Sequence, residues 1–136
     1  MLFRSHLYNY VGQPWRTQEI VDEVLHTLYF NNPDGLSGNE DCGQMSAWYI
    51  LNAMGFYQVC PGKPVYSIGR PLFNEATVHL KDGKSFKVIA HNNSRDNKYV
   101  RSIVLNGNKL ETPFFTHQDI VDGGTLELTM GSEPLK

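Results

Sequence analysis

The stretch GNEDCGQMSAWYILNAMG, residues 38–55, decides the fold prediction for this 136-residue chain. Residues 43–54 place apolar side chains around nearly the whole circumference of a helix. A helix that is apolar on several sides needs neighbours on those sides, so we expect it inside a larger helical array. Immediately before it, Asn39, Glu40 and Asp41 stand where the helix should begin.

A second helix is predicted upstream, over residues 17–30, TQEIVDEVLHTLYF. Its apolar side chains recur at spacings of one, three and four, which form one stripe along a helix. Residues 31–41, NNPDGLSGNED, are dominated by turn and capping residues. They therefore predict a surface loop between the two helices.

Downstream of residue 55 the apolar pattern changes to a period of two, which is typical of strands. Asp-Gly and Asn-Gly pairs between alternating runs predict tight hairpins. The fold class is therefore predicted as α+β, with two or three helices over residues 1–56 followed by an antiparallel β-sheet or sandwich over residues 57–136. The expected hairpins join residues 76–80 to 85–90 through Asp82-Gly83, and residues 100–105 to 109–111 through Asn106-Gly107.

Composition limits the class of protein. Hydrophobic residues make up 40% of the chain, charged residues 19%, and the net charge is −2, which favours a soluble globular protein over a nucleic-acid binder. No apolar run approaches the roughly 18 residues of a membrane span, and the first residues lack the apolar core of a signal peptide. Cys42 and Cys60 fit neither zinc nor CxxC spacing, and the sequence leaves open whether they pair.

Asp41 has two interpretations from its position alone. A carboxylate at a helix N-terminus accepts free backbone N–H groups and is held ionised by the positive end of the helix dipole, as a general base must be. The same placement suits an ordinary helix N-cap, a position that Asp commonly occupies. An extended segment would put Asn39 and Asp41 on one face and point Glu40 elsewhere.

Five segments carry a resemblance: YNYVGQPWRTQEIV, GNEDCGQMSAWYILNAMGFYQVCPG, YSIGRPLF, YVRSIVLNG and GGTLEL. They span about residues 8–130, and the block at residues 38–55 is the most specific. Together they resemble the carboxyl-terminal part of glycoside hydrolase family 92, which comprises calcium-dependent, inverting exo-α-mannosidases.

The resemblance implies a parent protein with an (α/α)6 toroid and a β-sandwich, to which this chain contributes the last toroid helices and the strands that follow. It implies a mannose-containing glycan as substrate, with α-1,2 linkages expected, and the rest of the parent polypeptide as partner. It also implies a calcium ion whose ligands lie mostly outside this chain, with no ligand assigned within it. The parent is expected to be periplasmic or secreted.

The resemblance also implies roles for the acidic run. Asp41 falls on the family's general base and Asn39 on its helper, a position where many relatives carry aspartate; Glu40 either holds the loop or touches the sugar. Inverting hydrolysis needs two carboxyl groups about 6.5–9.5 Å apart, one acid and one base. The family's general acid is a glutamate upstream of the region matched, so we expect this chain alone to be inactive.

Aromatic and amide side chains are further candidates for sugar binding, because aromatic faces stack on sugars and amides bind hydroxyls. Trp15 and Gln18 lie in the turn before a helix and are predicted to contact substrate, whereas Trp48 and Tyr49 lie in an apolar helix and are predicted to pack in the core. The alternative function is a non-catalytic β-sandwich module that binds carbohydrate or supports a neighbouring domain.

Overall fold

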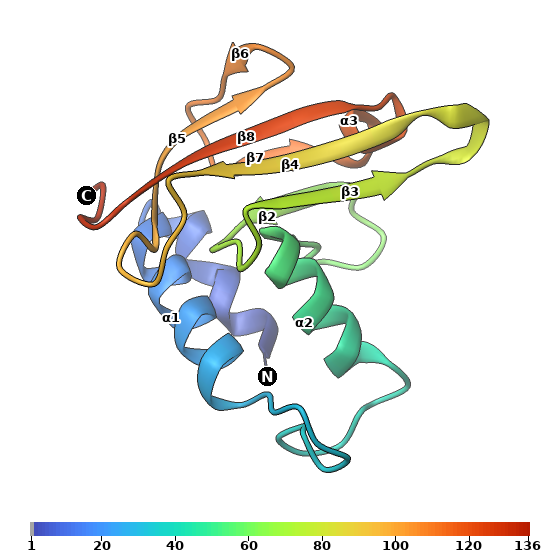
Figure 1. The fold of residues 1–136 in the computed structure, drawn as a ribbon, viewed down its shortest axis with the longest axis vertical. Coiled ribbons are helices and arrows are strands. Elements are labelled where there is room, and N and C mark those ends of the chain that lie inside the picture. The colour runs from blue at the N-terminus through green and yellow to red at the C-terminus, as the bar shows by residue number, and fades with distance from the viewer. Residues whose placement is uncertain (1) are drawn as a thin grey trace.

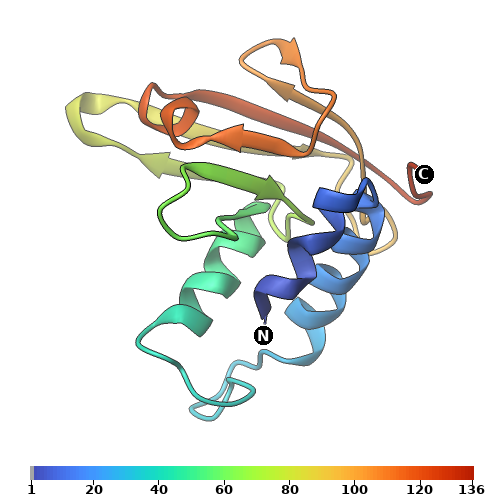
Figure 2. The same cartoon turned by 180° about the vertical axis from the view of Figure 1, so that it is seen from behind.

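The computed structural model describes residues 2–136, with the helices of residues 2–54 gathered at one end and the sheets at the other (Figure 1). A 3-10 helix, η1 (Leu2–Val11), lies beside α1 (Pro14–Thr27) in both views (Figures 1 and 2). The next helix, α2 (Gln44–Met54), contacts α1 through the buried side chain of Trp48.

Both predicted helices are confirmed, with shifted boundaries. α1 begins at Pro14 rather than at residue 17, because proline suits the first helical position, where a backbone N–H has no intrahelical partner. α2 ends at Gly55, whose φ of 109° lies in the left-handed region that glycine adopts without steric cost. A Cβ at Gly55 would also lie only 3.1 Å from the Pro71 Cβ, so the close approach of these segments requires glycine.

The strands form two sheets. A three-stranded antiparallel sheet has the order β1 (Phe56–Tyr57), β2 (Val65–Ile68), β7 (Phe114–Thr116). A five-stranded sheet has the order β3 (Glu75–His79), β4 (Ser85–His91), β8 (Gly124–Gly131), β5 (Tyr99–Leu105), β6 (Asn108–Lys109). The β3–β4 and β5–β6 hairpins confirm the two predicted turns.

The sheet is not wholly antiparallel as predicted, because β4 and β8 pair in parallel. A two-residue turn forces consecutive strands to be antiparallel, but strands that are distant in sequence are free of that constraint. The chain passes through β5, β6, β7 and a short helix, α3 (His117–Val121), before β8 enters between β4 and β5.

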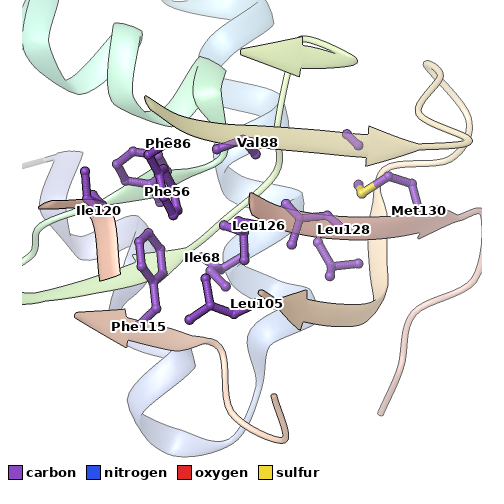
Figure 3. Close-up of a cluster of buried hydrophobic side chains, with 12 residues drawn as sticks. Phe56, Ile68, Phe86, Val88, Leu105, Phe115, Ile120, Leu126, Leu128 and Met130 are labelled. Atoms are coloured by element: carbon purple, nitrogen blue, oxygen red, sulfur yellow. The ribbon is translucent and has the colours of Figure 1, made fainter. Parts of the chain in front are cut away.

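One apolar core joins the two sheets (Figure 3). Phe56 and Phe115 from the small sheet pack edge to face at 5.3 Å between ring centroids, and Phe115 stacks on Phe86 of the large sheet at 5.8 Å. Leu51 and Met54 of α2 pack against this core, which fixes the end of α2 to the sheets. Within residues 2–136, no helix is both long enough and apolar enough to span a bilayer.

A buried polar network also ties η1 to α2 and β2. The Nε2–H of His6 donates to Asn52 Oδ1 at 2.7 Å, and the Ser67 hydroxyl donates to His6 Nδ1 at 3.0 Å. Ser67 Oγ in turn accepts a hydrogen bond from Asn9 Nδ2 at 2.6 Å. His6 is completely buried, and its neutral tautomer with the hydrogen on Nε2 makes both of its hydrogen bonds. Burial lowers the pKa of His6 to about 4, against an opposing effect of the Asn52 hydrogen bond.

The His6 network predicts acid sensitivity of folding. Between pH 6.5 and 4 the unfolded chain protonates His6 while the folded chain does not, so stability falls as the pH falls through this window. The contribution is on the order of 3 kcal/mol and is fully lost below pH 4. Urea unfolding at pH 7, 5.5 and 4 measures the loss, and His6→Gln should show a shallower decline over this window. An equal decline in both proteins would contradict a role for His6.

Candidate functional site

The loop between α1 and α2 lies at the end of the helices far from the sheets, at the bottom of Figure 1. It is held together by its own backbone: Phe30 N–H donates to Gly35 O at 2.9 Å, and Gly35 N–H donates to Asn32 O at 3.0 Å. Tyr29 and Leu36 form an isolated antiparallel bridge. A Cβ at Gly35 would lie 1.9 Å from the Phe30 carbonyl oxygen, so this compact turn requires glycine.

The last part of the loop enters α2 through a left-handed backbone. Asp41, Cys42 and Gly43 have φ values of 53°, 58° and 89°. An extended segment, which would place Asn39 and Asp41 on one face, therefore does not continue through Asp41. Such conformations cost about 1–3 kcal/mol for residues other than glycine, and an observed run of them suggests a position held for function.

Asp41 is not the helix N-cap, so the capping interpretation is also wrong. The N-cap of α2 is Gly43, which has no side chain to accept a hydrogen bond. Glu40 provides the acceptor instead, since its Oε1 accepts from Ser46 N–H at 3.1 Å. The carbonyl oxygens of Glu40 and Asp41 accept from Met45 and Gln44 N–H, at 3.2 and 3.3 Å. The loop thereby satisfies the first free donors of the helix.

The side chains of Asn39 and Asp41 are both exposed. Neither forms a hydrogen bond or an ion pair with any other residue in the range 2–136. Glu40 is half-buried and has a structural partner, whereas Asp41 next to it has none. The two acidic side chains therefore differ in their surroundings: one oxygen of Glu40 accepts from the helix and the other is buried without a partner among residues 2–136, whereas the Asp41 carboxylate is exposed.

Trp15 and Gln18 lie at the other end of α1, beside the large sheet. The loop with the acidic run follows the opposite end of this 14-residue helix, which is about 20 Å long. Gln18 is buried, and its Oε1 accepts from Val100 N–H at 3.1 Å, while the Arg16 guanidinium lies 4.9 Å from the Trp15 ring. The two residues share a cavity of about 140 Å³, but the structure does not bring them to Asp41.

The structure also tests the predictions for two aromatic residues of α2 and for the two cysteines. Trp48 is completely buried, and Tyr49 is half-buried against Tyr29, with the ring centroids 4.8 Å apart. Trp48 thus packs in the core as predicted, and Tyr49 packs against the same cluster while also lining the hollow formed by the loop. Cys42 and Cys60 are free, exposed thiols, which resolves the question of their pairing.

Glu40 was expected either to hold the loop or to touch the sugar, and the structure shows a bond that holds the loop, from Ser46 N–H to Glu40 Oε1. The sequence interpretation assigned the cap of this helix only to Asp41, although both carboxylates precede it. The pocket that the loop forms, with the 59% exposed Phe30 in its lining, was not predicted.

A family model described as the glycosyl hydrolase family 92 catalytic domain matches residues 3–132. The chain belongs to glycoside hydrolase family 92. Its solved family 92 relatives include the inverting mannosidase BT2199 of Bacteroides thetaiotaomicron VPI-5482, with 47% identity and a TM-score of 0.90. The α-mannosidase BT3965 of Bacteroides thetaiotaomicron has 41% identity and a TM-score of 0.91.

A curated relative, an uncharacterized secreted glycosidase of Arthroderma benhamiae, is 30% identical over 132 residues. These matches cover 97%, 98% and 95% of this chain, respectively, but only 18%, 18% and 17% of the relatives. The chain therefore corresponds to less than a fifth of the length of each of these three relatives. Its α+β fold is that of the matching part of family 92.

Proposed function

We propose that this chain supplies the general base, Asp41, to an inverting α-mannosidase that removes α-1,2-linked mannose from glycans. The observation that carries the proposal is the division of roles in the acidic run. Glu40 caps α2, whereas the Asp41 carboxylate is exposed and has no partner among residues 2–136. A base must have a free lone pair to accept a proton from water.

In this proposal Asp41 takes a proton from the water that attacks the anomeric carbon, while an acid on the opposite face of the sugar protonates the leaving oxygen. The amide of Asn39, two residues before, accepts or donates a hydrogen bond to the same water and orients it. Glu40 holds the loop through Ser46. The acid would come from elsewhere in a longer polypeptide, whose preceding helices would complete a toroid with residues 1–56.

The names of the relatives support the substrate class, since two of them are mannosidases. The secreted relative supports a periplasmic or secreted parent. No group of three His, Cys, Asp or Glu side chains suited to a metal occurs within residues 2–136. In this proposal the ligands of the calcium ion would lie mostly in other parts of the parent.

A chimera tests the proposal. These 136 residues replace the matching segment of BT2199, and the variant of BT2199 that simply lacks the segment serves as control. We expect the chimera to hydrolyse an aryl α-mannoside and release β-mannose first, as followed by proton NMR. The isolated 136-residue chain should show no turnover, with or without calcium.

Two results would contradict the proposal. Turnover by the isolated chain would mean that a general acid lies within it. A chimera that melts cooperatively but hydrolyses nothing would favour the alternative function, a non-catalytic module that binds carbohydrate or supports its neighbours.

A further inference from the structure

The segment that carries Asp41 is held to the first turn of α2 by backbone N–H groups of that turn. Gln44 N–H donates to Asp41 O at 3.3 Å, and Met45 N–H donates to Glu40 O at 3.2 Å. The Asp41 side chain is exposed and binds no other residue among 2–136, so its place depends on its backbone. The position of the Asp41 carboxylate therefore depends on what fixes Gln44 and Met45.

A tyrosine hydroxyl from another part of the fold bonds to each of these two residues. The side-chain amide of Gln44 donates to the Tyr57 hydroxyl at 3.3 Å. The Tyr29 hydroxyl donates to Met45 O at 3.0 Å. Tyr57 belongs to β1, and Tyr29 lies two residues beyond the end of α1. The first turn of α2 is thus fastened both to the small sheet and to the segment that follows the preceding helix.

Both tyrosine rings pack against the buried ring of Trp48. Tyr29 stacks on Trp48 with 5.8 Å between ring centroids, and Tyr57 lies tilted against it at 6.5 Å. Tyr57 is also paired with Ser67 across the small sheet and contacts the buried His6 ring at 5.6 Å. Because Trp48 is completely buried, the core holds the two hydroxyls in place, independently of the exposed loop.

The hydroxyl groups contribute hydrogen bonds that packing alone does not need. A phenyl ring would fill the same space against Trp48, whereas a hydroxyl that leaves water needs a partner. Burial, then the Glu40 carboxylate and then Tyr57 raise the pKa of Tyr29 to about 12. The Tyr29 hydroxyl therefore keeps its proton at neutral pH and remains a donor to Met45 O.

The backbone next to this turn is strained and needs such support. Asp41 and Cys42 have φ values of 53° and 58°, in the left-handed region that residues with a Cβ rarely adopt. Strain of this kind persists only where the surrounding structure fixes it. The two tyrosines bond to Gln44 and Met45, the residues at which the strained segment ends.

We propose that Tyr57 and Tyr29 are positioning residues for the base: their hydroxyls hold Gln44 and Met45, which keep the Asp41 carboxylate within reach of the attacking water. This inference rests on the proposed function, because the tyrosines act on the reaction only through Asp41. Neither tyrosine touches the reacting atoms. Loss of a hydroxyl lets the strained segment relax, so kcat falls while sugar binding, and with it KM, changes little.

Amide hydrogen exchange in the 136-residue chain is the first test, because it measures how firmly the turn is held. Tyr57→Phe should speed exchange of the Gln44 N–H about 10-fold, since it removes a hydrogen bond that fixes this residue. Tyr29→Phe should speed exchange of the Met45 N–H by a similar factor.

Tyr66→Phe is the matched control for both variants. The Tyr66 hydroxyl also bonds to a side chain, His117 Nδ1 at 3.1 Å, but this bond joins β2 to α3 and does not involve α2. The exchange rates of the Gln44 and Met45 N–H groups should therefore be the same in Tyr66→Phe as in the unaltered chain.

The chimera with BT2199 gives a second, kinetic test. Each single change, Tyr57→Phe or Tyr29→Phe, should lower kcat about 10-fold, and the double variant about 100-fold. KM should change less than about 2-fold in all three variants. Tyr66→Phe should leave both constants unchanged. A kcat that is unaffected by the loss of either hydroxyl would overturn the positioning role.

Azide distinguishes a misplaced base from a general loss of structure. Azide is already an anion, so it attacks the anomeric carbon without a base: a C–N bond forms, the C–O bond to the aryloxy group breaks, and the enzyme's acid protonates the departing oxygen. Azide should raise turnover of the double tyrosine variant and of Asp41→Asn, with β-mannosyl azide as product. A lowered kcat that azide does not restore in the double variant would overturn the positioning role.

The two proposals fail separately. If Asp41 is not the base, Asp41→Asn leaves hydrolysis intact, yet the Gln44 and Met45 N–H groups still exchange faster without the tyrosine hydroxyls. If the positioning role is wrong, hydrolysis still depends on Asp41, while Tyr57→Phe and Tyr29→Phe leave amide exchange and kcat unchanged.

Discussion

Asp41→Asn is expected to lower kcat of the BT2199 chimera by about 10²–10⁴-fold, the range that general acid–base catalysis contributes. Asparagine has nearly the same shape but cannot accept a proton from water at neutral pH. The melting temperature should change little, because the Asp41 side chain is exposed and bonds to no other residue among 2–136. Asparagine also tolerates the left-handed backbone at this position, where φ is 53°.

Glu40 provides the matched control for Asp41. Glu40→Gln keeps an oxygen acceptor for Ser46 N–H and should retain most of the activity. Glu40→Ala removes the acceptor, so its main effect should be on stability, a loss of about 1 kcal/mol as for other helix caps. Loss of stability in Asp41→Asn, with turnover per folded molecule unchanged, would reverse the two roles.

Arg70→Leu is expected to lower the free energy of unfolding by about 3–5 kcal/mol. Arg70 Nε lies 2.9 Å from Asp22 Oδ1, and both side chains are nearly inaccessible, at 3% and 10% exposure. Burial lowers the pKa of Arg70, and the Asp22 carboxylate opposes this effect. Leucine would leave Asp22 opposite an apolar group, with only longer contacts of Oδ1 to His26 Nδ1 at 3.4 Å and to the exposed Arg95 at 3.7 Å. Arg70 also donates to Pro71 O and to Ser94 O, so two more bonds would be lost.

Chemical unfolding at pH 7 measures the effect of Arg70→Leu. Glu75→Gln is the control, because its ion pair with Lys87 has a similar length, 2.9 Å, but is exposed, and it should cost less than about 1 kcal/mol. The double variant Asp22→Asn/Arg70→Leu should be more stable than Arg70→Leu alone. A loss of under about 1 kcal/mol in Arg70→Leu would show that the buried pair contributes no more than a surface one.

Much of the fold could be predicted from residues that act locally. The apolar pattern of residues 43–54 predicted α2 within a residue, and the pairs Asp82-Gly83 and Asn106-Gly107 predicted two hairpins with their strand partners. Helix periodicity and turn geometry depend on neighbours a few positions away. Helices and tight turns can therefore be predicted from a single sequence. The family followed from the same block, because residues 38–55 are both a helix start and a specific motif.

Tertiary structure alone decided the features that join distant residues. The parallel pairing of β4 with β8 depends on the path of the chain between residues 91 and 124, which no local pattern describes. The neutral His6 depends on partners contributed by α2 and β2, 46 and 61 residues further along the chain. Burial and long-range pairing are properties of the packed chain.

The acidic run, residues 39–41, shows most clearly which features the sequence determines and which depend on the folded structure. The sequence by itself determined that a carboxylate stands at the start of α2, next to an asparagine, and which family motif it belongs to. It could not determine which carboxylate binds the helix, because Glu40 and Asp41 are both suited to that role. The left-handed backbone at Asp41 and Cys42 moves the helix start to Gly43, brings Glu40 to Ser46 N–H and leaves Asp41 in solvent. Side-chain direction follows from backbone geometry, and that geometry exists only in the folded chain.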